Sequence, residues 1–448
     1  MSTTRIAEAI DYYHELLTGE FRQDILDFLP QALTNPHILV AGRPVCNVLR
    51  PYFIDRQTYN YVRDSSGLIM RAIGRLGQAL MEDVNLRIQI DLSQDEEEAI
   101  HIDMGYGAHD LSARLDGFLT PDKQFHFVEY NADSPGGIAF GEVISEIFGG
   151  LPLLKTFGKR FPWMHFHPRH TVFNVLISTY HRWGGSGLPN IAIIDWRGVS
   201  TYNEFLLSQS YFESKGCRVK VADPGELEFR DGGVYIGDFP IQLIYKRLLV
   251  GDILTKLGIK HPLVEAVRRR AVCMVNGFRV QMLFKKMIFA LLSDPVNEHL
   301  FDSTTNNAIA RHIPWTRRVK ECKTTYKGRT VDLIPFIAQN RDHLVLKPNA
   351  EYGGRGVVLG WECEDSHWAE ALQNAVDTSY VVQERVPVAK ESFPSLIEGE
   401  IRFNDRYFDL DPYVWDGARI EGCGVRLSSM ALLNVAGGGS ATPMFVLE

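Results

Sequence analysis

Apolar residues in the first 90 positions of the chain recur at intervals of three and four. The segments RIAEAIDYYHELL (5–17) and GLIMRAIGRLGQALMEDV (67–84) show this spacing most clearly. Such spacing places apolar side chains on one face of an α-helix, so both segments are predicted to be amphipathic helices. We therefore expect a largely helical region over residues 1–100.

A different pattern begins near residue 110. LSARLDGFL (111–119) and FHFVEYN (125–131) have the composition of strands, and the sequence TPDK between them favours a type I turn. These features predict a β-hairpin over residues 110–131. A turn centred on the middle of TPDK would set Arg114 opposite Glu129.

Four polar side chains of this hairpin are predicted to share one face. Alternate residues of a strand point the same way, so Arg114 lies with Asp116, and Glu129 with Asn131. Register shifts that keep the parity of opposing residues leave the four groups together. Carboxylate and amide oxygens, without His or Cys, are ligands that suit Mg²⁺. Phosphate oxygens usually complete the coordination shell of this ion. An exposed, salt-bridged hairpin is the alternative, and the residues alone favour neither.

The hairpin runs into Ser134-Pro135-Gly136-Gly137, after which apolar residues follow at helical spacing. Ser134 can cap that helix, with Pro135 in its first position. A helix that begins beside the acidic face offers backbone N–H groups to an anion. An ordinary capped helix is the alternative.

The middle of the chain alternates between strand and helix patterns. NIAIIDW (190–196) and CRVKVADP (217–224) are predicted to be buried strands, separated by a helix that Gly216 closes. IQLIYKR (241–247) is expected to continue the same sheet. A helical stretch is predicted around residues 260–293.

A second polar constellation lies some 200 residues beyond the hairpin. LVLKPNAEYGGRGVVLGWE (344–362) carries Lys347 at the end of a strand, followed by a loop with Gly353, Gly354 and Gly356. Backbone N–H groups of such a loop can fold over phosphates, while a lysine supplies positive charge. Neither GxxxxGK[ST] nor a GxGxxG that opens a helix is present. A mobile turn is the alternative.

Two further strand-like segments carry polar residues. SYVVQERVP (379–387) ends in Gln383 and Glu384, which can present backbone groups to adenine and a carboxylate to ribose, although such a pair alone is uninformative. Asp409 and Asp411 share a strand face in the C-terminal part. They are interpreted either as further acidic groups near the site or as a surface strand end.

Composition excludes several classes of function. The formal net charge is −8 without a basic tail, which argues against nucleic acid as a partner. The six cysteines lie far apart with no CxxC pair, as expected for free thiols in a reducing compartment. No stretch approaches the ~20 apolar residues of a membrane span, and the N-terminus lacks an apolar signal core. We expect a cytoplasmic protein without a membrane or nucleic-acid partner.

The order of the motifs resembles that of a known family. A strand, Lys-Pro, a Gly-rich loop, a strand and Gln-Glu follow one another as in the nucleotide-binding half of ATP-grasp enzymes. The motifs Arg114-Leu115-Asp116 and Glu129-Tyr130-Asn131-Ala132-Asp133 precede this half here, whereas most of the superfamily has its acidic strand afterwards. The chain thus resembles the circularly permuted ATP-grasp branch, of the glutathionylspermidine synthase type, over roughly residues 100–448.

The resemblance implies an α+β or α/β chain with the ATP-grasp fold in permuted order, a helical N-terminal region and a small Rossmann-like lobe. We expect five parts: a helical region (1–100), a hairpin and helix with the metal motif (101–185), the small α/β lobe (186–260), the nucleotide-binding lobe (261–400) and C-terminal return strands that complete the site (401–448).

The resemblance also assigns roles to residues. It implies that Arg114 is the catalytic cation and that Asp116, Glu129 and Asn131 bind Mg²⁺. The implied ATP contacts are Lys246, Lys286 (or its neighbour Lys285), Lys347, Gly353, Gly354, Gly356, Gln383 and Glu384, and the implied substrate contacts are Ser134 and Arg426.

The activity implied by the resemblance is ATP- and Mg²⁺-dependent ligation of a small-molecule or peptide carboxylate to an amine through an acyl phosphate. Two alternatives stay open. One is a non-catalytic nucleotide-binding protein on the same fold, and the other is phosphoryl transfer to a hydroxyl or water. The chain has no room for the extra hydrolase domain of the bifunctional synthases.

Overall fold

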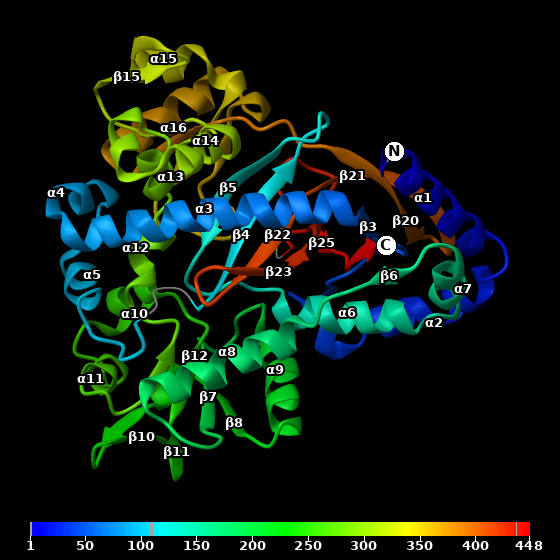
Figure 1. Ribbon diagram of the computed structural model, residues 1–448, viewed down its shortest axis with the longest axis horizontal. Coiled ribbons are helices and arrows are strands. Elements are labelled where there is room, and N and C mark those ends of the chain that lie inside the picture. The colour runs from blue at the N-terminus through cyan, green and yellow to red at the C-terminus, as the bar shows by residue number, and fades with distance from the viewer. Residues whose placement is uncertain (1, 108–110, 436) are drawn as a thin grey trace.

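The computed structural model describes residues 2–107, 111–435 and 437–448, so residue 110 of the predicted hairpin and residue 436 of the C-terminal part lie outside the described residues. The described residues form helices and several sheets, which confirms a mixed α/β chain. Figure 1 shows three groups of elements around a central sheet: one lobe at the top, another at the bottom, and the two termini at the right.

The central sheet joins distant parts of the chain. Its strand order is β23-β22-β4-β5, so C-terminal strands lie beside the hairpin that carries the polar motif. The strand bounds are β4 Ser112–Leu119, β5 Phe125–Asn131, β22 Asp411–Trp415 and β23 Arg419–Gly424. The predicted hairpin is confirmed, and two strands from the C-terminal part extend it.

The N-terminal region packs helices against this sheet. The longest is α3 (Arg56–Glu82), whose first turn is capped by the Asp55 carboxylate accepting from the Thr58 backbone N–H. Its apolar stripe, which includes Ile73 and Leu76, is fully buried. The other helices of this region are α1 Ser2–Thr18, α2 Arg22–Leu33, α4 Val84–Arg87 and α5 Gln94–Ala99.

Both ends of the chain meet in one small sheet. β3 (Tyr52–Asp55) pairs in parallel with the C-terminal strand β26 (Met444–Leu447), and β6 (Trp163–Met164) lies on the other side of β26. Figure 1 accordingly shows the two termini close together. The remaining elements before residue 186 are β1 Leu39–Val40, β2 Arg43–Pro44, α6 Ile138–Gly150, α7 Pro152–Arg160 and α8 Pro168–Trp183.

The predicted strand–helix–strand unit is confirmed as a parallel α/β lobe. β7 (Asn190–Ile194), α9 (Tyr202–Ser214) and β8 (Arg218–Ala222) follow in order, and the sheet order is β13-β12-β7-β8. The last strands of the lobe are β12 Leu243–Lys246 and β13 Cys273–Val275. A small antiparallel sheet is formed by β9 Glu228–Arg230, β10 Gly233–Ile236 and β11 Phe239–Ile241.

β13 corrects the predicted helical stretch around 260–293. Its three residues are buried and pair with β12, so a strand of the α/β lobe interrupts the helices. Since every residue of the Cys-Met-Val strand is buried, no polar–apolar alternation marks it in the sequence. The helices around it are α10 Val250–Leu257, α11 Pro262–Arg268, α12 Val280–Phe284 and α13 Met287–Leu292.

A second lobe has its own hydrophobic core, which includes Leu346, Trp368 and Val382. Its antiparallel sheet has the order β14-β19-β17-β18. The strands are β14 Thr316–Arg318, β17 Leu344–Pro348, β18 Val358–Leu359 and β19 Tyr380–Glu384. Around them lie α14 Ser303–His312, α15 Leu333–Gln339, α16 Asp365–Asp377 and the hairpin of β15 Lys323–Tyr326 and β16 Arg329–Asp332.

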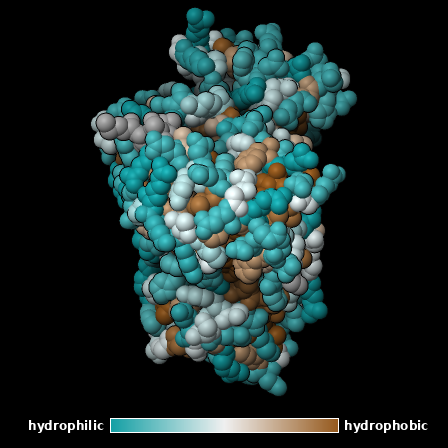
Figure 2. All heavy atoms as spheres, turned by 90° about the vertical axis from the view of Figure 1, so that its right-hand side faces the viewer, coloured by the Kyte–Doolittle hydropathy of each residue, from teal (hydrophilic) through white to brown (hydrophobic). Residues whose placement is uncertain are grey.

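The C-terminal part contributes one more sheet, in the order β20-β21-β24-β25. Its strands are β20 Lys390–Ile397, β21 Glu400–Phe408, β24 Arg426–Ser428 and β25 Ser440–Ala441. Among the described residues, no helix has the length and apolar character needed to cross a bilayer. Figure 2 shows one face of the molecule, on which hydrophilic residues dominate and hydrophobic ones form scattered patches.

Candidate active site

A cavity of about 840 Å³ lies between the central sheet, the α/β lobe and the sheet that contains β17 and β19. It brings together most of the residues that the sequence singled out. Those in its wall are Arg114, Asp116, Glu129, Asn131, Ser134, Lys286, Lys347, Gly353, Gly354, Gln383, Glu384, Asp409, Asp411 and Arg426.

The four polar residues of the hairpin share one face, but their predicted register is wrong by two residues. Arg114 lies opposite Asn131, and Asp116 lies opposite Glu129. The parity of the pairing is as predicted, so all four side chains line the same cavity. Asp116 is almost completely buried, whereas the Glu129 side chain keeps 26% of its surface exposed.

The turn and a β-bulge each shift the pairing by one residue. β5 advances by two residues, from Phe127 to Glu129, while β4 advances by one, from Gly117 to Asp116, so Val128 is an extra residue. Without the extra residue, Glu129 would point to the opposite face of the sheet from Asp116. A Cβ atom on Gly117 would lie 2.9 Å from a carbonyl oxygen of β5, so glycine permits the close approach at the bulge.

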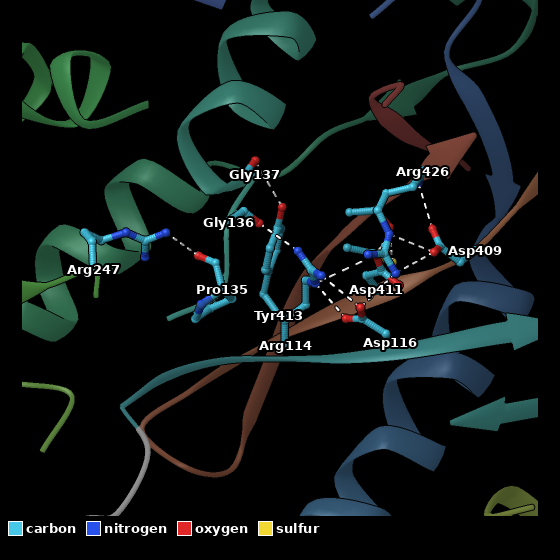
Figure 3. A network of polar contacts seen from close by, with 12 residues as sticks. Arg114, Asp116, Pro135, Gly136, Gly137, Arg247, Asp409, Asp411, Tyr413 and Arg426 are labelled. Atoms are coloured by element: carbon cyan, nitrogen blue, oxygen red, sulfur yellow. Dashed lines mark hydrogen bonds and ion pairs between the residues drawn. The ribbon is translucent and has the colours of Figure 1, made fainter. Parts of the chain in front are cut away.

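Two arginines and three buried aspartates form one network at this face of the sheet (Figure 3). Arg114 donates to both carboxylate oxygens of Asp116, at 2.7 and 2.9 Å. Arg426 donates to Asp116 Oδ2 at 2.7 Å and to Asp409 Oδ2 at 2.8 Å. Asp411 Oδ2 lies 2.9 Å from Arg426 Nε and 3.7 Å from Arg114 Nε. Three carboxylates thus face two guanidinium groups.

The carboxyl groups of this network differ in their proton affinity. Burial opposes ionisation of Asp116, but the positive charges of Arg114 and Arg426 outweigh it and lower its pKa to about 2. Burial raises the pKa of Asp409 and, to a greater extent, that of Asp411, with Asp116 adding like-charge repulsion. The two arginines therefore hold Asp116 in its ionised form.

Asp409 and Asp411 are fully buried, so their interpretation as a surface strand end is wrong. Their burial could not be predicted from the sequence, because alternation on a strand does not tell which face meets a partner sheet. Tyr413 was not predicted at all. It is buried, lines the cavity and pairs with Arg114 across β22 and β4.

Two lysines of the cavity wall, Lys286 beside α13 and Lys347 on β17, extend toward the hairpin. Lys286 Nζ lies 2.7 Å from Glu129 Oε1 and donates to the Glu351 carbonyl oxygen. Lys347 donates to the carbonyl oxygen of the bulge residue Val128 at 3.0 Å and to Gln383 Oε1 at 2.7 Å. Burial lowers the pKa of Lys347 to about 8, with nearby Lys286 acting in the same direction.

The structure distinguishes Lys286 from its neighbour Lys285. Lys286 lines the cavity, whereas the Lys285 amine contacts both carboxylate oxygens of Glu96 at 2.9 Å in a buried ion pair of the helical region. Lys286 is therefore the residue of the two that faces the cavity.

The donors on the hairpin fit a magnesium ion by their chemistry. Asp116, Glu129 and Asn131 supply hard oxygen atoms on one wall of the cavity. Within the described part of the chain, no group of three or more His, Cys, Asp or Glu residues is arranged to hold a metal ion. The predicted set has only two carboxylates and an amide. Arg114 and Arg426 contact Asp116, and Lys286 contacts Glu129.

The glycine-rich loop faces the cavity from the side of β17. Gly353, Gly354 and Gly356 all have positive φ angles, between 64° and 76°, which only glycine adopts without strain. Gly353 and Gly354 line the cavity, whereas Gly356 does not and instead packs against Pro348. Asn434 donates to the Gly353 carbonyl oxygen at 2.6 Å, so the C-terminal segment contacts this loop directly.

Gln383 and Glu384 lie at the same end of the cavity but inside the sheet. β19 pairs with β14 on one side and β17 on the other, and the Glu384 N–H donates to the Trp315 carbonyl oxygen. The sheet thus uses the Glu384 N–H, so this group does not face adenine, while the contact of the pair with a nucleotide stays a prediction. The Glu384 carboxylate faces the cavity and contacts Tyr326 at 2.9 Å and Lys327 at 2.8 Å.

The predicted anion site at the helix after the hairpin is also corrected. α6 begins at Ile138, and the backbone N–H groups of Gly137 and Ala139 donate to the Glu204 carboxylate at 3.1 and 3.0 Å. Ser134 does not cap the helix and donates to the Arg247 carbonyl oxygen. Glu204 reaches this point from α9 by tertiary packing, which no local pattern predicts.

The carbonyl groups of the Ser-Pro-Gly-Gly turn face donors instead (Figure 3). They accept hydrogen bonds from Arg247 to Pro135 at 2.7 Å, from Arg114 to Gly136 at 2.8 Å and from Tyr413 to Gly137 at 3.3 Å. This turn therefore ties Arg114 to the α/β lobe through Arg247.

Lys246 lies in the protein interior and not in the cavity wall. Its side chain is fully buried, forms an ion pair with Asp133 and donates to the Leu248 carbonyl oxygen. The other Asp133 oxygen accepts from the Val250 N–H at 2.6 Å. The structure thus gives Lys246 a structural partner in place of the predicted nucleotide contact, while its neighbour Arg247 lines the cavity.

Lys246→Met is expected to lower the free energy of unfolding by about 3 kcal/mol, because it leaves the Asp133 carboxylate buried without a cation. Chemical denaturation of the purified protein measures this loss. The double variant Lys246→Met/Asp133→Asn is expected to recover part of the loss. A single variant as stable as the wild type would contradict this account of the pair.

Comparison with known proteins adds a fold but no family. No model of a known protein family matches the sequence, and no curated protein matches it significantly. A solved structure, the glutathione synthetase-like effector from Globodera pallida in its apo form, aligns with a TM-score of 0.61 and 11% sequence identity over 100% of this chain and 98% of that chain. The chain therefore has the fold of a glutathione synthetase-like protein, which is consistent with an ATP-grasp-like arrangement.

Proposed function

We propose that the protein is an ATP- and Mg²⁺-dependent ligase that joins a carboxylate to an amine through an acyl phosphate. The observation that carries this proposal is the meeting of Arg114, Asp116 and Glu129 with Lys286 and Lys347 in one cavity. Cations for phosphates, oxygen donors for a divalent metal and an arginine beside them are the groups that phosphoryl transfer needs.

The proposal assigns the nucleotide to the lobe of β17 and β19. Lys286 and Lys347 bind its phosphates, and the loop with Gly353 and Gly354 closes over them. The base lies toward Glu384, against apolar cavity residues such as Val345, Leu359, Trp361 and Val386. In this arrangement the acidic hairpin precedes the nucleotide lobe in the chain, which supports the circularly permuted order and the glutathionylspermidine synthase-like relationship.

At neutral pH a carboxylate and an amine form a salt and not an amide, so the acyl oxygen must first be activated. Mg²⁺ bound to Asp116, Glu129 and Asn131 would neutralise charge on the ATP phosphates. Arg114 orients the reacting carboxylate and stabilises the negative charge that develops on the acyl oxygen as the amine attacks. Its bonds to Asp116 and Gly136 fix the guanidinium before substrate arrives.

Water must be kept from an acyl phosphate. The Gly353 loop and the segment of Asn434 cover the same side of the cavity and are joined by a hydrogen bond. They form a cover that closes with nucleotide bound, which protects the intermediate from hydrolysis.

The proposal is tested by measuring ADP and phosphate release against panels of thiol peptides, amino acids and polyamines, with products identified by mass spectrometry. We expect one carboxylate–amine pair to give stoichiometric ADP and a new amide, and EDTA to abolish both. Phosphate esters in place of an amide would indicate a phosphotransferase. Nucleotide binding without turnover on any pair would favour a non-catalytic binding protein.

A further inference from the structure

Asp411 holds an unusual position beside the proposed metal ligands. Tyr413 pairs with Arg114, and Leu410 bridges to Gly117, so Asp411 lies opposite Asp116 across β22 and β4. The two carboxylates therefore flank the two guanidinium groups from neighbouring strands, as Figure 3 shows.

The carboxylates of Asp116 and Asp411 differ in the hydrogen bonds that they accept. Asp116 accepts hydrogen bonds from both Arg114 and Arg426. Asp411 is at least as deeply buried, yet neither of its oxygens accepts a hydrogen bond from any described residue. Its contact with Arg426 Nε at 2.9 Å is out of line with the N–H bond, which points to Asp409. A buried carboxylate without donors is costly, so this arrangement calls for a second state.

Under the proposed function, the second state would be the protein with a metal ion bound to Asp116. Asp116 would hold a metal ion through oxygen lone pairs that accept from two arginines in the structure, and the ion's positive charge would then lie close to both guanidinium groups. Arg114 and Arg426 then need another acceptor at the same place. Asp411 lies within 3.7 Å of Arg114 Nε and within 2.9 Å of Arg426 Nε, and its oxygens are unused.

We propose that Asp411 is a positioning residue that takes over Arg114 and Arg426 from Asp116 when the metal–nucleotide complex binds. This inference rests on the proposed function, because it needs a metal ion on Asp116. Small rotations of the two guanidinium groups bring their N–H bonds onto Asp411, so both arginines stay paired at the cavity wall. Asp411 then acts on metal affinity without touching the metal, as outer partners of metal ligands do.

The test compares Asp411→Asn with Asp409→Asn, two variants of neighbouring buried aspartates on the same network. Asp409 accepts hydrogen bonds from the Arg426 backbone N–H and from Arg426 Nε, so Asp409→Asn is expected to lower the melting temperature without metal. Asp411→Asn is expected to melt like the wild type without metal, since it breaks no hydrogen bond there.

For metal affinity, we expect Asp411→Asn to have the larger effect of the two variants. Mn²⁺ binding in the presence of a non-hydrolysable ATP analogue, followed by electron paramagnetic resonance, is expected to weaken by about 10- to 100-fold in Asp411→Asn and far less in Asp409→Asn. Equal Mn²⁺ affinity in Asp411→Asn and the wild type would overturn the proposal for Asp411. Absence of Mn²⁺–nucleotide binding by the wild type would instead refute the proposed function.

A second measurement serves if Asp411→Asn does not fold. A crystal structure of the wild-type chain with Mg²⁺ and the same analogue is expected to show guanidinium N–H groups of Arg114 and Arg426 hydrogen-bonded to Asp411. An Asp411 still without donors, with both arginines on a metal-bound Asp116, would contradict the exchange.

Discussion

Arg114→Ala is expected to lower the rate of substrate-dependent ADP release by about 10³-fold while nucleotide affinity stays within about threefold of the wild type. The reason lies in the geometry of the cavity. Arg114 is fixed by the two Asp116 oxygens and the Gly136 carbonyl oxygen, and its guanidinium is beside the proposed path of the reacting carboxylate. Lys286 and Lys347, which hold the phosphates in the proposal, come from another lobe and are left intact.

Arg114→Lys is the matched control for this prediction. A lysine keeps the charge, but it loses the forked contact with Asp116, so an intermediate loss of rate is expected. ADP release gives the rate, and calorimetric titration with an ATP analogue gives the affinity. If both arginine variants lost nucleotide binding to the same extent as turnover, Arg114 would be a nucleotide ligand and not a group that acts on the acyl phosphate.

For the hairpin of β4 and β5, the sequence pattern predicted which side chains share a face but not the register of the two strands. The period of two in a strand correctly placed Arg114, Asp116, Glu129 and Asn131 on one face, because parity is a local property of each strand. The register itself was wrong, because the β-bulge at Val128 depends on contacts across the sheet. Parity survived since the turn and the bulge together shift the pairing by an even number of residues.

Partners that come from tertiary packing were beyond prediction. Lys246 was expected in the nucleotide site, yet Asp133, which is more than 100 residues away in the chain, pairs with it in the interior. The helix after the hairpin was expected to receive an anion, yet Glu204 already supplies the carboxylate there. In both cases the residue type was informative about charge, and only the fold determined which opposite charge it meets.

Glu129→Gln is expected to uncouple nucleotide binding from Mg²⁺. In the structure Glu129 pairs with Lys286 at 2.7 Å, so the proposed metal ligand and the proposed phosphate ligand neutralise each other. Under the proposed function, binding of a metal–nucleotide complex is expected to separate them, with Glu129 bound to the metal and Lys286 to a phosphate. Metal and nucleotide should therefore bind the wild type more tightly together than either does alone.

The glutamine variant removes one of the two carboxylates of the proposed metal site and the ion pair with Lys286 at the same time. We expect metal-free binding of an ATP analogue to strengthen several-fold, and the gain in affinity on adding Mg²⁺ to fall by about 100-fold. Calorimetric titrations in EDTA and in Mg²⁺ measure both quantities.

Glu384→Gln provides the matched control. Glu384 also lines the cavity and forms an ion pair, with Lys327 at 2.8 Å, but it lies near the proposed base and far from the proposed phosphates. It is expected to change the two affinities alike and leave the Mg²⁺ effect unaltered. A Glu129→Gln variant with a full Mg²⁺ effect would mean that Glu129 is not a metal ligand, and that its pairing with Lys286 only holds the two lobes together.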